Sequence, residues 1–178
     1  VPTEQVYGGI KAIGFKDVIE VARGAEITTE KETHEFAEKM EEGQAFMTTS
    51  CCPSYMEMAR KHAPELQKYI STTYSPMIYT ADIAHEKYPN AKLVFVGPCI
   101  AKRKEVRRED LKGKVDFVLT YEEVHAILGG MNIELGEANV HPVDCASRRS
   151  AHGFAENGGV TAAVKELVNG KIDFTTLQ

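Results

Sequence analysis

The hydrophobic positions change their period several times along the chain, and each change predicts a new element. Val6, Ile10 and Ile13 recur at helical spacing, and Gly14 follows them as a stop. A second helix is predicted over residues 30–42. Further helices are predicted from Pro53 to about His62, along the stripe Met77, Ala81, Ala84 and Tyr88, over residues 121–128, and along Val160, Val164 and Leu167.

Short apolar or β-branched runs between these helices predict strands. They lie at residues 45–49, 92–96, 115–120 and 172–175. Strands that alternate with helices are typical of an α/β fold, with a mostly parallel sheet and flanking helices. A length of 178 residues fits one compact domain, or one lobe of a larger domain.

Composition and charge exclude several classes of protein. Hydrophobic residues make up 43% and charged residues 26%, which is ordinary for a soluble globular domain. The net charge is −5 with both signs mixed along the chain, so nucleic acid is not an expected partner. No apolar run approaches the roughly 18 residues that a membrane span needs. The first residues lack the pattern of a signal peptide, and we therefore expect a cytoplasmic protein.

The four cysteines, Cys51, Cys52, Cys99 and Cys145, carry the most specific chemistry. They are too few for a secreted disulfide scaffold, and no C-x-x-C pair indicates zinc. Adjacent cysteines rarely bond to each other, because the ring that they would form is strained. The cysteines are therefore free thiols, or ligands of something other than zinc.

Two predicted strands run into turns that contain cysteine. Residues 45–49 lead into the Cys51-Cys52 pair, and residues 92–96 lead into Cys99. Ligands of parallel sheets lie beyond the carboxyl ends of the strands, so the two turns lie side by side if the strands are neighbours. Pro53 is typical of the first position of a helix.

The helix that begins at Pro53 places Cys52 at its N-terminus. Unpaired N–H groups and the helix dipole favour a thiolate there, or an anionic iron–sulfur cluster. Two consecutive side chains point in different directions, so one thiol can bind a cluster while the other carries protons. The spacing alone leaves open a simpler interpretation, in which Cys51 and Cys52 are buried small residues.

Four segments, in order, resemble the iron-only ([FeFe]) hydrogenases. Residues 49–55 (TSCCPSY) resemble the family's T-S-C-C-P run followed by an aromatic residue. Residues 98–105 (PCIAKRKE) resemble its P-C-x-x-K-x-x-E motif. Residues 115–121 (VDFVLTY) and 153–160 (GFAENGGV) resemble the D-x-D-x-V-x-T and F-G-A-T-G-G-V segments. The first two motifs are highly specific, and the resemblance extends over most of the chain.

The resemblance implies roles for the thiols and for a proton path. Cys52 and Cys99 would be two of the four thiolates that hold a [4Fe–4S] cluster, and Cys51 the free thiol that passes protons to a diiron subsite. Ser71, Glu32 and Glu35 match positions of the family's proton channel. The two glutamates are three residues apart and share a helix face. A solvated charged face is the alternative interpretation for them.

Other matched residues belong to the pocket of the diiron subsite. Lys102 matches the lysine that contacts a cyanide ligand, and Ser75 and Phe154 match residues that line the pocket. Glu105 matches the motif glutamate, for which we expect a structural salt bridge. Cys145 matches no ligand position, and we interpret it as a packed or incidental thiol.

Parts of the family pattern are missing from the 178 residues. The third signature, which carries two more cysteines, does not occur, nor does the pocket segment that precedes the first helix. We therefore expect residues 1–178 to form one lobe and part of the other lobe of the cluster (H-cluster) domain. A [4Fe–4S] cluster needs four thiolate ligands, and two do not bind it stably. The chain alone is expected to be inactive and free of cluster, to need the remainder of its parent chain, and to self-associate through exposed apolar faces.

Three substitutions near the motifs point to a divergent branch. Gly97 stands in place of the usual methionine, Met77 in place of a glutamine and Tyr55 in place of a tryptophan. Groups around the metal ligands tune the potential and proton supply of a metal site, so slower or sensory hydrogen chemistry is compatible with these changes.

The resemblance implies that the parent protein interconverts protons, electrons and dihydrogen, with a ferredoxin-type electron donor or acceptor as partner. Two alternatives are a hydrogen-sensing regulatory domain and a Nar-type iron–sulfur assembly protein without hydrogenase activity. The adjacent cysteines disfavour the assembly protein, because that group usually lacks the free proton-relay thiol. A thiol protein of unrelated function is the remaining alternative.

Overall fold

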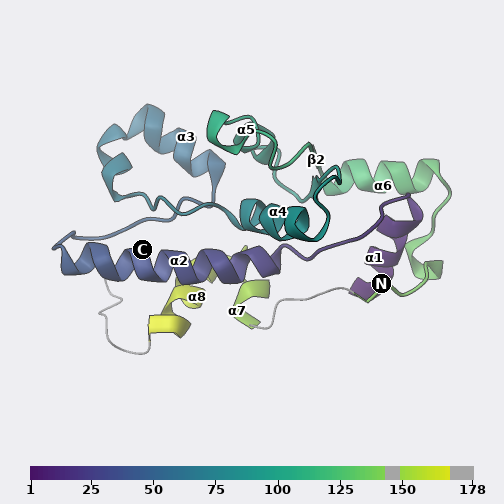
Figure 1. Ribbon diagram of the computed structural model, residues 1–178, viewed down its shortest axis with the longest axis horizontal. Coiled ribbons are helices and arrows are strands. Elements are labelled where there is room, and N and C mark those ends of the chain that lie inside the picture. Colours follow the sequence, from purple (N-terminus) through teal and green to yellow (C-terminus); the bar gives the residue numbers. More distant parts are fainter. Residues whose placement is uncertain (143–148, 169–178) are drawn as a thin grey trace. The chain divides into compact units, whose positions relative to one another are not determined.

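A computed structural model of the chain describes residues 1–142 and 149–168. Within these residues the chain is mostly helical, with one two-stranded parallel sheet. It divides into two compact units, each built from two stretches of sequence (Figure 1). Unit 1 comprises Val1–Glu20 and Ala84–Cys145, and unit 2 comprises Val21–Ile83 and Ala146–Gln178.

Unit 1 holds the sheet and the helices that flank it in sequence. Its elements are α1 (Thr3–Ala12), β1 (Val94–Val96), α5 (Lys102–Glu105), the 3₁₀ turn η2 (Glu109–Leu111), β2 (Phe117–Leu119), α6 (Tyr121–Gly130) and the 3₁₀ turn η3 (Leu135–Glu137). Helix α1 packs against η3 and the residues after it. The approach is so close that a Cβ at Gly8 would lie 1.6 Å from the carbonyl oxygen of Asn139, which only glycine permits.

The two strands of the sheet pair in parallel, with Phe95 opposite Val118. The ladder extends past the end of β1, because the N–H of Gly97 donates to the carbonyl of Leu119 at 3.1 Å. Directly after β2, Thr120 begins α6 with a capping box, in which its hydroxyl accepts from the N–H of Glu123. The parallel pairing of these two segments follows the expectation from the sequence.

Unit 2 is built around the 20-residue helix α2 (Ala22–Glu41). Its other elements are α3 (Pro53–His62), the 3₁₀ turn η1 (Pro64–Tyr69), α4 (Pro76–Lys87, which passes into unit 1 at Ala84), α7 (Arg149–His152) and α8 (Gly159–Val168). Both α7 and α8 pack along α2 (Figure 1). A buried cluster of Ala25, Ala151, Phe154 and Ala163 joins the three helices.

Helix α2 begins eight residues before the predicted start. The missed turns contain Gly24, Thr28 and Thr29, which are weak helix formers and hide the helical pattern. Tertiary contacts stabilise them: the hydroxyl of Thr28 donates to the carbonyl of Gly24 at 3.0 Å, and Thr29 is 3% exposed. Gly24 itself lies against the start of α4, where a Cβ would come within 2.0 Å of the carbonyl oxygen of Pro76.

The predicted strand at residues 45–49 is not formed. Only one parallel bridge, between Thr48 and Ile70, joins this segment to another part of unit 2. Phe46 stacks on Tyr69 instead of entering a sheet, with 4.2 Å between the ring centroids. The chain is therefore more helical than the mostly parallel α/β sheet that the sequence predicts. The predicted strand at residues 172–175 lies outside the described residues.

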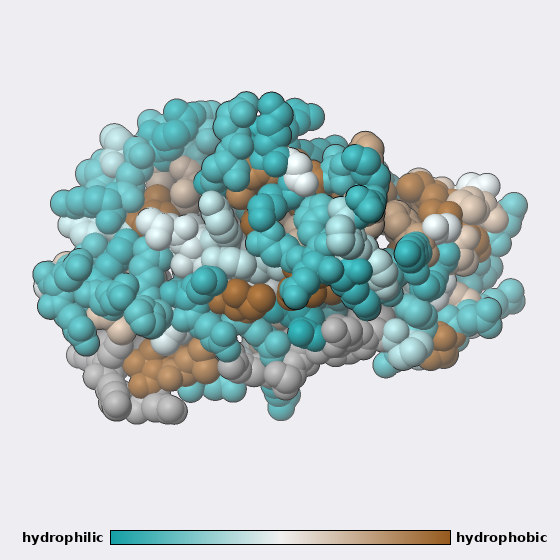
Figure 2. Space-filling view, viewed as in Figure 1, coloured by the Kyte–Doolittle hydropathy of each residue, from teal (hydrophilic) through white to brown (hydrophobic). Residues whose placement is uncertain are grey.

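The face of the molecule seen in Figure 2 is largely hydrophilic. Figure 2 shows charged and polar side chains over most of the visible face, with hydrophobic side chains gathered in separate areas. No helix in residues 1–142 or 149–168 is both long enough and apolar enough to cross a membrane.

Candidate functional site

The adjacent cysteines lie in unit 2, in the turn that leads into α3. Cys52 is the residue before the helix, in an extended conformation, and Pro53 occupies the first helical position. Cys52 is exposed. Cys51 is half-buried against the cluster that contains Phe154, and its Sγ lies 3.5 Å from the hydroxyl of Thr49. The two thiols therefore have different surroundings, one open to solvent and one packed against apolar side chains.

Glu32 lies on α2 and is 1% exposed, which is rare for a carboxylate without a cation beside it. Its Oε1 accepts the N–H of Ser50, the residue before Cys51, at 3.4 Å. Its Oε2 is buried and accepts no hydrogen bond from the described residues. Burial raises the pKa of Glu32 to about 7, and the charge of Glu35 acts in the same direction, against the Ser50 N–H and the Ser71 hydroxyl, which lower it.

Glu35 lies one turn further along α2 and has the opposite environment. The hydroxyl of Ser71 donates to its Oε2 at 2.6 Å, and the N–H of Thr72 donates to its Oε1 at 2.9 Å. Lys39 forms an ion pair with Oε1 at 3.0 Å. Burial raises the pKa of Glu35, but these three partners outweigh it and hold the pKa below its usual value.

The segment 71–73 joins the glutamates to the cysteine turn. Ser71 is 3% exposed, and its hydroxyl accepts the N–H of Thr73 at 3.0 Å while donating to Glu35. The hydroxyl of Ser50 donates to the carbonyl of Thr73. The structure therefore brings Glu32, Glu35 and Ser71 into one polar network that reaches the residue before Cys51.

Ser75 and Phe154 are buried, at 2% and 7% exposure. Ser75 lies just before α4, and its carbonyl accepts the N–H of Ile78. Phe154 follows α7 and lies in the apolar cluster against which Cys51 packs. The structure therefore places Phe154 and Cys51 in or against the same apolar cluster.

Cys99, Lys102 and Glu105 lie in unit 1, after β1. Cys99 is half-buried, and its carbonyl accepts the N–H of Lys102. The ammonium of Lys102 forms an ion pair with Glu105 at 2.6 Å, and the two side chains are 13% and 7% exposed. Because both charges are largely removed from water, each charge is stabilised mainly by the other. The salt bridge expected of Glu105 is present, and its partner is Lys102.

The described residues do not fit a complete iron–sulfur site. A [4Fe–4S] cluster takes four thiolates. Cys52 and Cys99 belong to different units, and no group of three His, Cys, Asp or Glu side chains among residues 1–142 and 149–168 could hold a metal ion. Cys145 lies outside the described residues. Cys52 and Cys99 therefore account for at most part of the ligand set of such a cluster.

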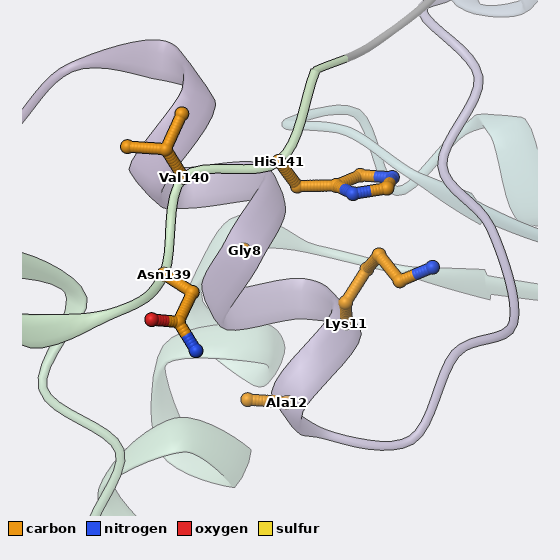
Figure 3. A pocket seen from close by; sticks show the side chains of 6 residues that line it. All are labelled: Gly8, Lys11, Ala12, Asn139, Val140 and His141. Atoms are coloured by element: carbon orange, nitrogen blue, oxygen red, sulfur yellow. The ribbon is translucent and has the colours of Figure 1, made fainter.

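A hollow of about 310 Å³ lies in unit 1, and none of the residues that line it is a predicted site residue (Figure 3). It is bounded by α1 and by residues 139–141. Figure 3 shows the side chains of Lys11 and His141 on one side of it. The Lys11 ammonium donates to the carbonyl of Lys16 at 2.7 Å, and His141 lies 3.7 Å from Asp17. Both groups have partners within the protein, and the hollow is not assigned a function.

Sequence reasoning missed the groups that complete the network around Glu35. Lys39 and the hydroxyls of Thr72 and Thr73 all contact this carboxylate. The run of four hydroxyl residues in residues 71–74, together with a lysine four residues after Glu35, is the signal that could have indicated them.

A family model described as "Iron only hydrogenase large subunit, C-terminal domain" matches residues 1–177. Iron hydrogenase 1 of Clostridium pasteurianum is 27% identical over 90% of this chain and 31% of that protein. The cytosolic Fe-S cluster assembly factor NAR1 of Eremothecium gossypii is 31% identical over 68% of this chain and 27% of that protein. The chain spans about a third or less of the length of the curated relatives it matches.

The fold also matches solved structures. The [FeFe]-hydrogenase HydA1 of Chlamydomonas reinhardtii, solved as a variant, superposes with a TM-score of 0.73 at 27% identity, covering 81% of this chain and 40% of that one. A HydA structure that describes stepwise H-cluster assembly matches with a TM-score of 0.72 at 28% identity, covering 81% of this chain and 39% of that one. At this similarity, part of the hydrogenase fold is shared.

Proposed function

Because the chain belongs to the iron-only hydrogenase family, matching the C-terminal domain of its large subunit, we propose that it is part of a hydrogenase-type protein that interconverts protons, electrons and dihydrogen. Its own contribution is to carry protons along unit 2, from Glu35 and Ser71 past Glu32 to Cys51. The observation that carries the proposal is Glu32, a carboxyl that is buried beside the cysteine turn and has a pKa of about 7.

A proton relay needs groups that gain and lose a proton near neutral pH. Glu32 meets this condition because burial raises its pKa to about 7. Glu35 is ionised and attracts protons from solvent, and the Ser71 hydroxyl, which both donates and accepts, is bound to it. Cys51 has a thiol proton to exchange and lies partly out of water.

In the longer protein, Cys52 and Cys99 would be two of the four thiolates of a [4Fe–4S] cluster, and Ser75, Phe154 and Lys102 would line the diiron subsite of the H-cluster. The cluster supplies the redox chemistry when it is bound. The mostly apolar surroundings of Cys51 and Phe154 exclude water from one side of the thiol. We infer that the remaining ligands come from the rest of the parent chain and that these residues alone have no hydrogenase activity.

The electron partner of the parent protein is proposed to be a ferredoxin-type carrier, and its location the cytoplasm. The description of the NAR1 relative as cytosolic supports the location. Nucleic acid and membrane are not proposed as partners. Self-association of the isolated chain through apolar faces stays a prediction.

The test uses the full-length parent protein and two matched variants. Cys51→Ala is expected to keep the iron content of the cluster and to lose most hydrogen turnover, because it removes the proton donor alone. Cys52→Ala is expected to lose cluster iron. Iron analysis and electron paramagnetic resonance distinguish the two variants. Loss of the cluster in Cys51→Ala, with retention in Cys52→Ala, would show that the two roles are reversed.

Iron–sulfur cluster assembly is the second candidate, because the NAR1 relative is 31% identical. This role would be favoured if the parent protein binds a [4Fe–4S] cluster but neither evolves nor oxidises dihydrogen. Cys51→Ala would then be indistinguishable from wild type.

A hydrogen-sensing domain is the third candidate. Slow turnover that depends on Cys51 would favour that role.

A further inference from the structure

The second cysteine turn, residues 97–99 in unit 1, begins with a buried glycine. Gly97 is buried although the next residue, Pro98, is exposed. Cys99 is half-buried between Pro98 and Ile100, and the Ile100 side chain is 68% exposed. Gly97 is therefore buried within a turn whose next residues, Pro98 and Ile100, are themselves exposed.

The ring of Phe95 lies directly over Gly97. A Cβ at residue 97 would be 2.8 Å from both Cε1 and Cζ of the ring, closer than real Cβ contacts. Residues two apart in a strand project to the same face, which explains how the ring reaches residue 97. The space that a side chain at residue 97 would fill is therefore occupied by the aromatic ring of residue 95.

Neither partner of this contact can easily move away. Phe95 lies in the middle of β1 and is paired with Val118. Gly97 is held to the same ladder by the 3.1 Å hydrogen bond from its N–H to Leu119. Pro98 then fixes the backbone between Gly97 and Cys99, because its ring locks φ. The backbone from Phe95 to Pro98 is therefore held by the ladder and by the proline ring.

We propose that Phe95, seated over Gly97, is the residue that controls access to the Cys99 thiol. Its ring forms an apolar wall at the carboxyl end of β1 and keeps water and solutes from one side of the turn. Gly97 is required because any side chain at that position displaces the wall. The inference concerns the same turn as the proposed function but not its chemistry, since Phe95 covers Cys99 whether or not this thiol binds a cluster.

The test measures how fast each cysteine of the 178-residue chain is alkylated, with peptide mass spectrometry to separate the sites. Phe95→Ala is expected to raise the labelling rate of Cys99 several-fold, while the rate of the exposed Cys52 stays constant. The matched control is Phe117→Ala, which removes a phenyl group from the other strand of the same sheet, where the ring is 59% exposed. This control is expected to leave the Cys99 rate unchanged.

Two reagents separate access from thiol reactivity. If Phe95 blocks access sterically, Phe95→Ala is expected to raise the rate at which a bulky maleimide labels Cys99 by a larger factor than the rate of a small methylthiolating reagent. Equal rates in wild type and Phe95→Ala would overturn the proposal, as would an equal gain in Phe117→Ala. An equal gain for both reagents would also overturn it, because the change would then lie in the thiol itself.

A second variant covers the case in which Phe95→Ala does not fold. Gly97→Ala keeps the ring but forces it aside, so it is expected to raise Cys99 labelling and to lower the melting temperature. Gly129→Ala is its control, because a Cβ there meets nothing within 4 Å. In the double variant Phe95→Ala/Gly97→Ala, the loss in melting temperature is expected to be smaller than the sum of the single losses, since the clash is gone. Additive losses, or unchanged labelling in Gly97→Ala, would contradict the proposal.

Discussion

The hydroxyl of Ser71 donates a 2.6 Å hydrogen bond to the carboxylate of Glu35, across 36 residues of sequence. The same hydroxyl accepts the N–H of Thr73. A serine in this arrangement fixes the loop that follows it and keeps Glu35 charged. Glu35 and the more deeply buried Glu32 have opposite shifts in pKa although both lie on one helix, because burial dominates at Glu32 and hydrogen-bonding partners dominate at Glu35.

Ser71→Ala is expected to destabilise the chain by about 1.5 kcal/mol at pH 7, because a hydrogen bond to a charged group is lost. The pKa of Glu35 is held below its usual value, so its stabilisation is present at neutral pH and is lost as the pH falls through the pKa of the folded state. The difference in stability between variant and wild type therefore narrows as the pH falls below about 4.3, the ordinary pKa of a glutamate. Urea denaturation at pH 7 and in this acidic range measures the difference, with the exposed Ser54→Ala as control. A difference independent of pH would contradict the assignment.

Glu32→Gln tests the raised pKa of Glu32. A carboxyl whose folded pKa is about 7 stabilises the fold only while it is protonated. This stability is complete below the unfolded pKa and is lost as the pH rises through about 7. We expect wild type to lose on the order of 3 kcal/mol relative to Glu32→Gln between pH 4.5 and 8. Denaturation of both proteins across this range gives the difference directly. Parallel pH curves would show that folding does not raise the pKa of Glu32.

Glu105→Gln is expected to destabilise unit 1 strongly, by about 3 kcal/mol, because it leaves the largely buried ammonium of Lys102 without its carboxylate. The matched control is Glu109→Gln. Glu109 pairs with Lys112 at 3.8 Å, but the two side chains are 90% and 79% exposed, so the loss is expected to stay below about 0.5 kcal/mol. Thermal and urea unfolding of the two variants decide the question. Equal losses would mean that burial of the Lys102–Glu105 pair has no energetic effect.

Gly24→Ala is expected to cost about 2 kcal/mol or more, because its Cβ would meet the carbonyl oxygen of Pro76. The clash pushes α2 from the start of α4, so the labelling of Cys51 is expected to change as well. Gly129→Ala on α6 has open space around it and is expected to be neutral or stabilising by up to roughly 1 kcal/mol, since alanine favours helix. A Gly24→Ala variant as stable as Gly129→Ala would rule out the close contact.

The sequence predicted the elements that are determined by short-range features, such as a proline at a helix start or a helical period of apolar residues. Pro53 marked the start of α3, and the period of the apolar residues located α4, α6 and α8. The segment 45–49 was misread because an apolar β-branched run becomes a strand only with a partner, and Ile70 supplies a single bridge. The first turns of α2 depend on contacts with residues about 50 positions away, such as that between Gly24 and Pro76, which no local pattern contains.

In the candidate site, too, the sequence predicted what depends on local spacing and missed what depends on distant contacts. Helical spacing indicated that Glu32 and Glu35 share a face. It could not indicate that one is buried and the other is bound by Ser71 and Thr72, because that asymmetry arises from a loop folded over α2. The seating of the Phe95 ring over Gly97 was likewise invisible, since a glycine at a strand end is ordinarily read as a turn signal.

The bridge between Thr48 and Ile70 determines which residues can move together. The N–H of Thr48 donates to the carbonyl of Tyr69, and the N–H of Ser71 donates to the carbonyl of Thr48, both at 2.8 Å. These two bonds close a ring of chain that contains the cysteine turn and α3, with Ser71 at its base. Hydrogen exchange at the amides of Thr48 and Ser71 therefore reports one cooperative opening, in which the cysteine turn and the loop that binds Glu35 are released in the same event.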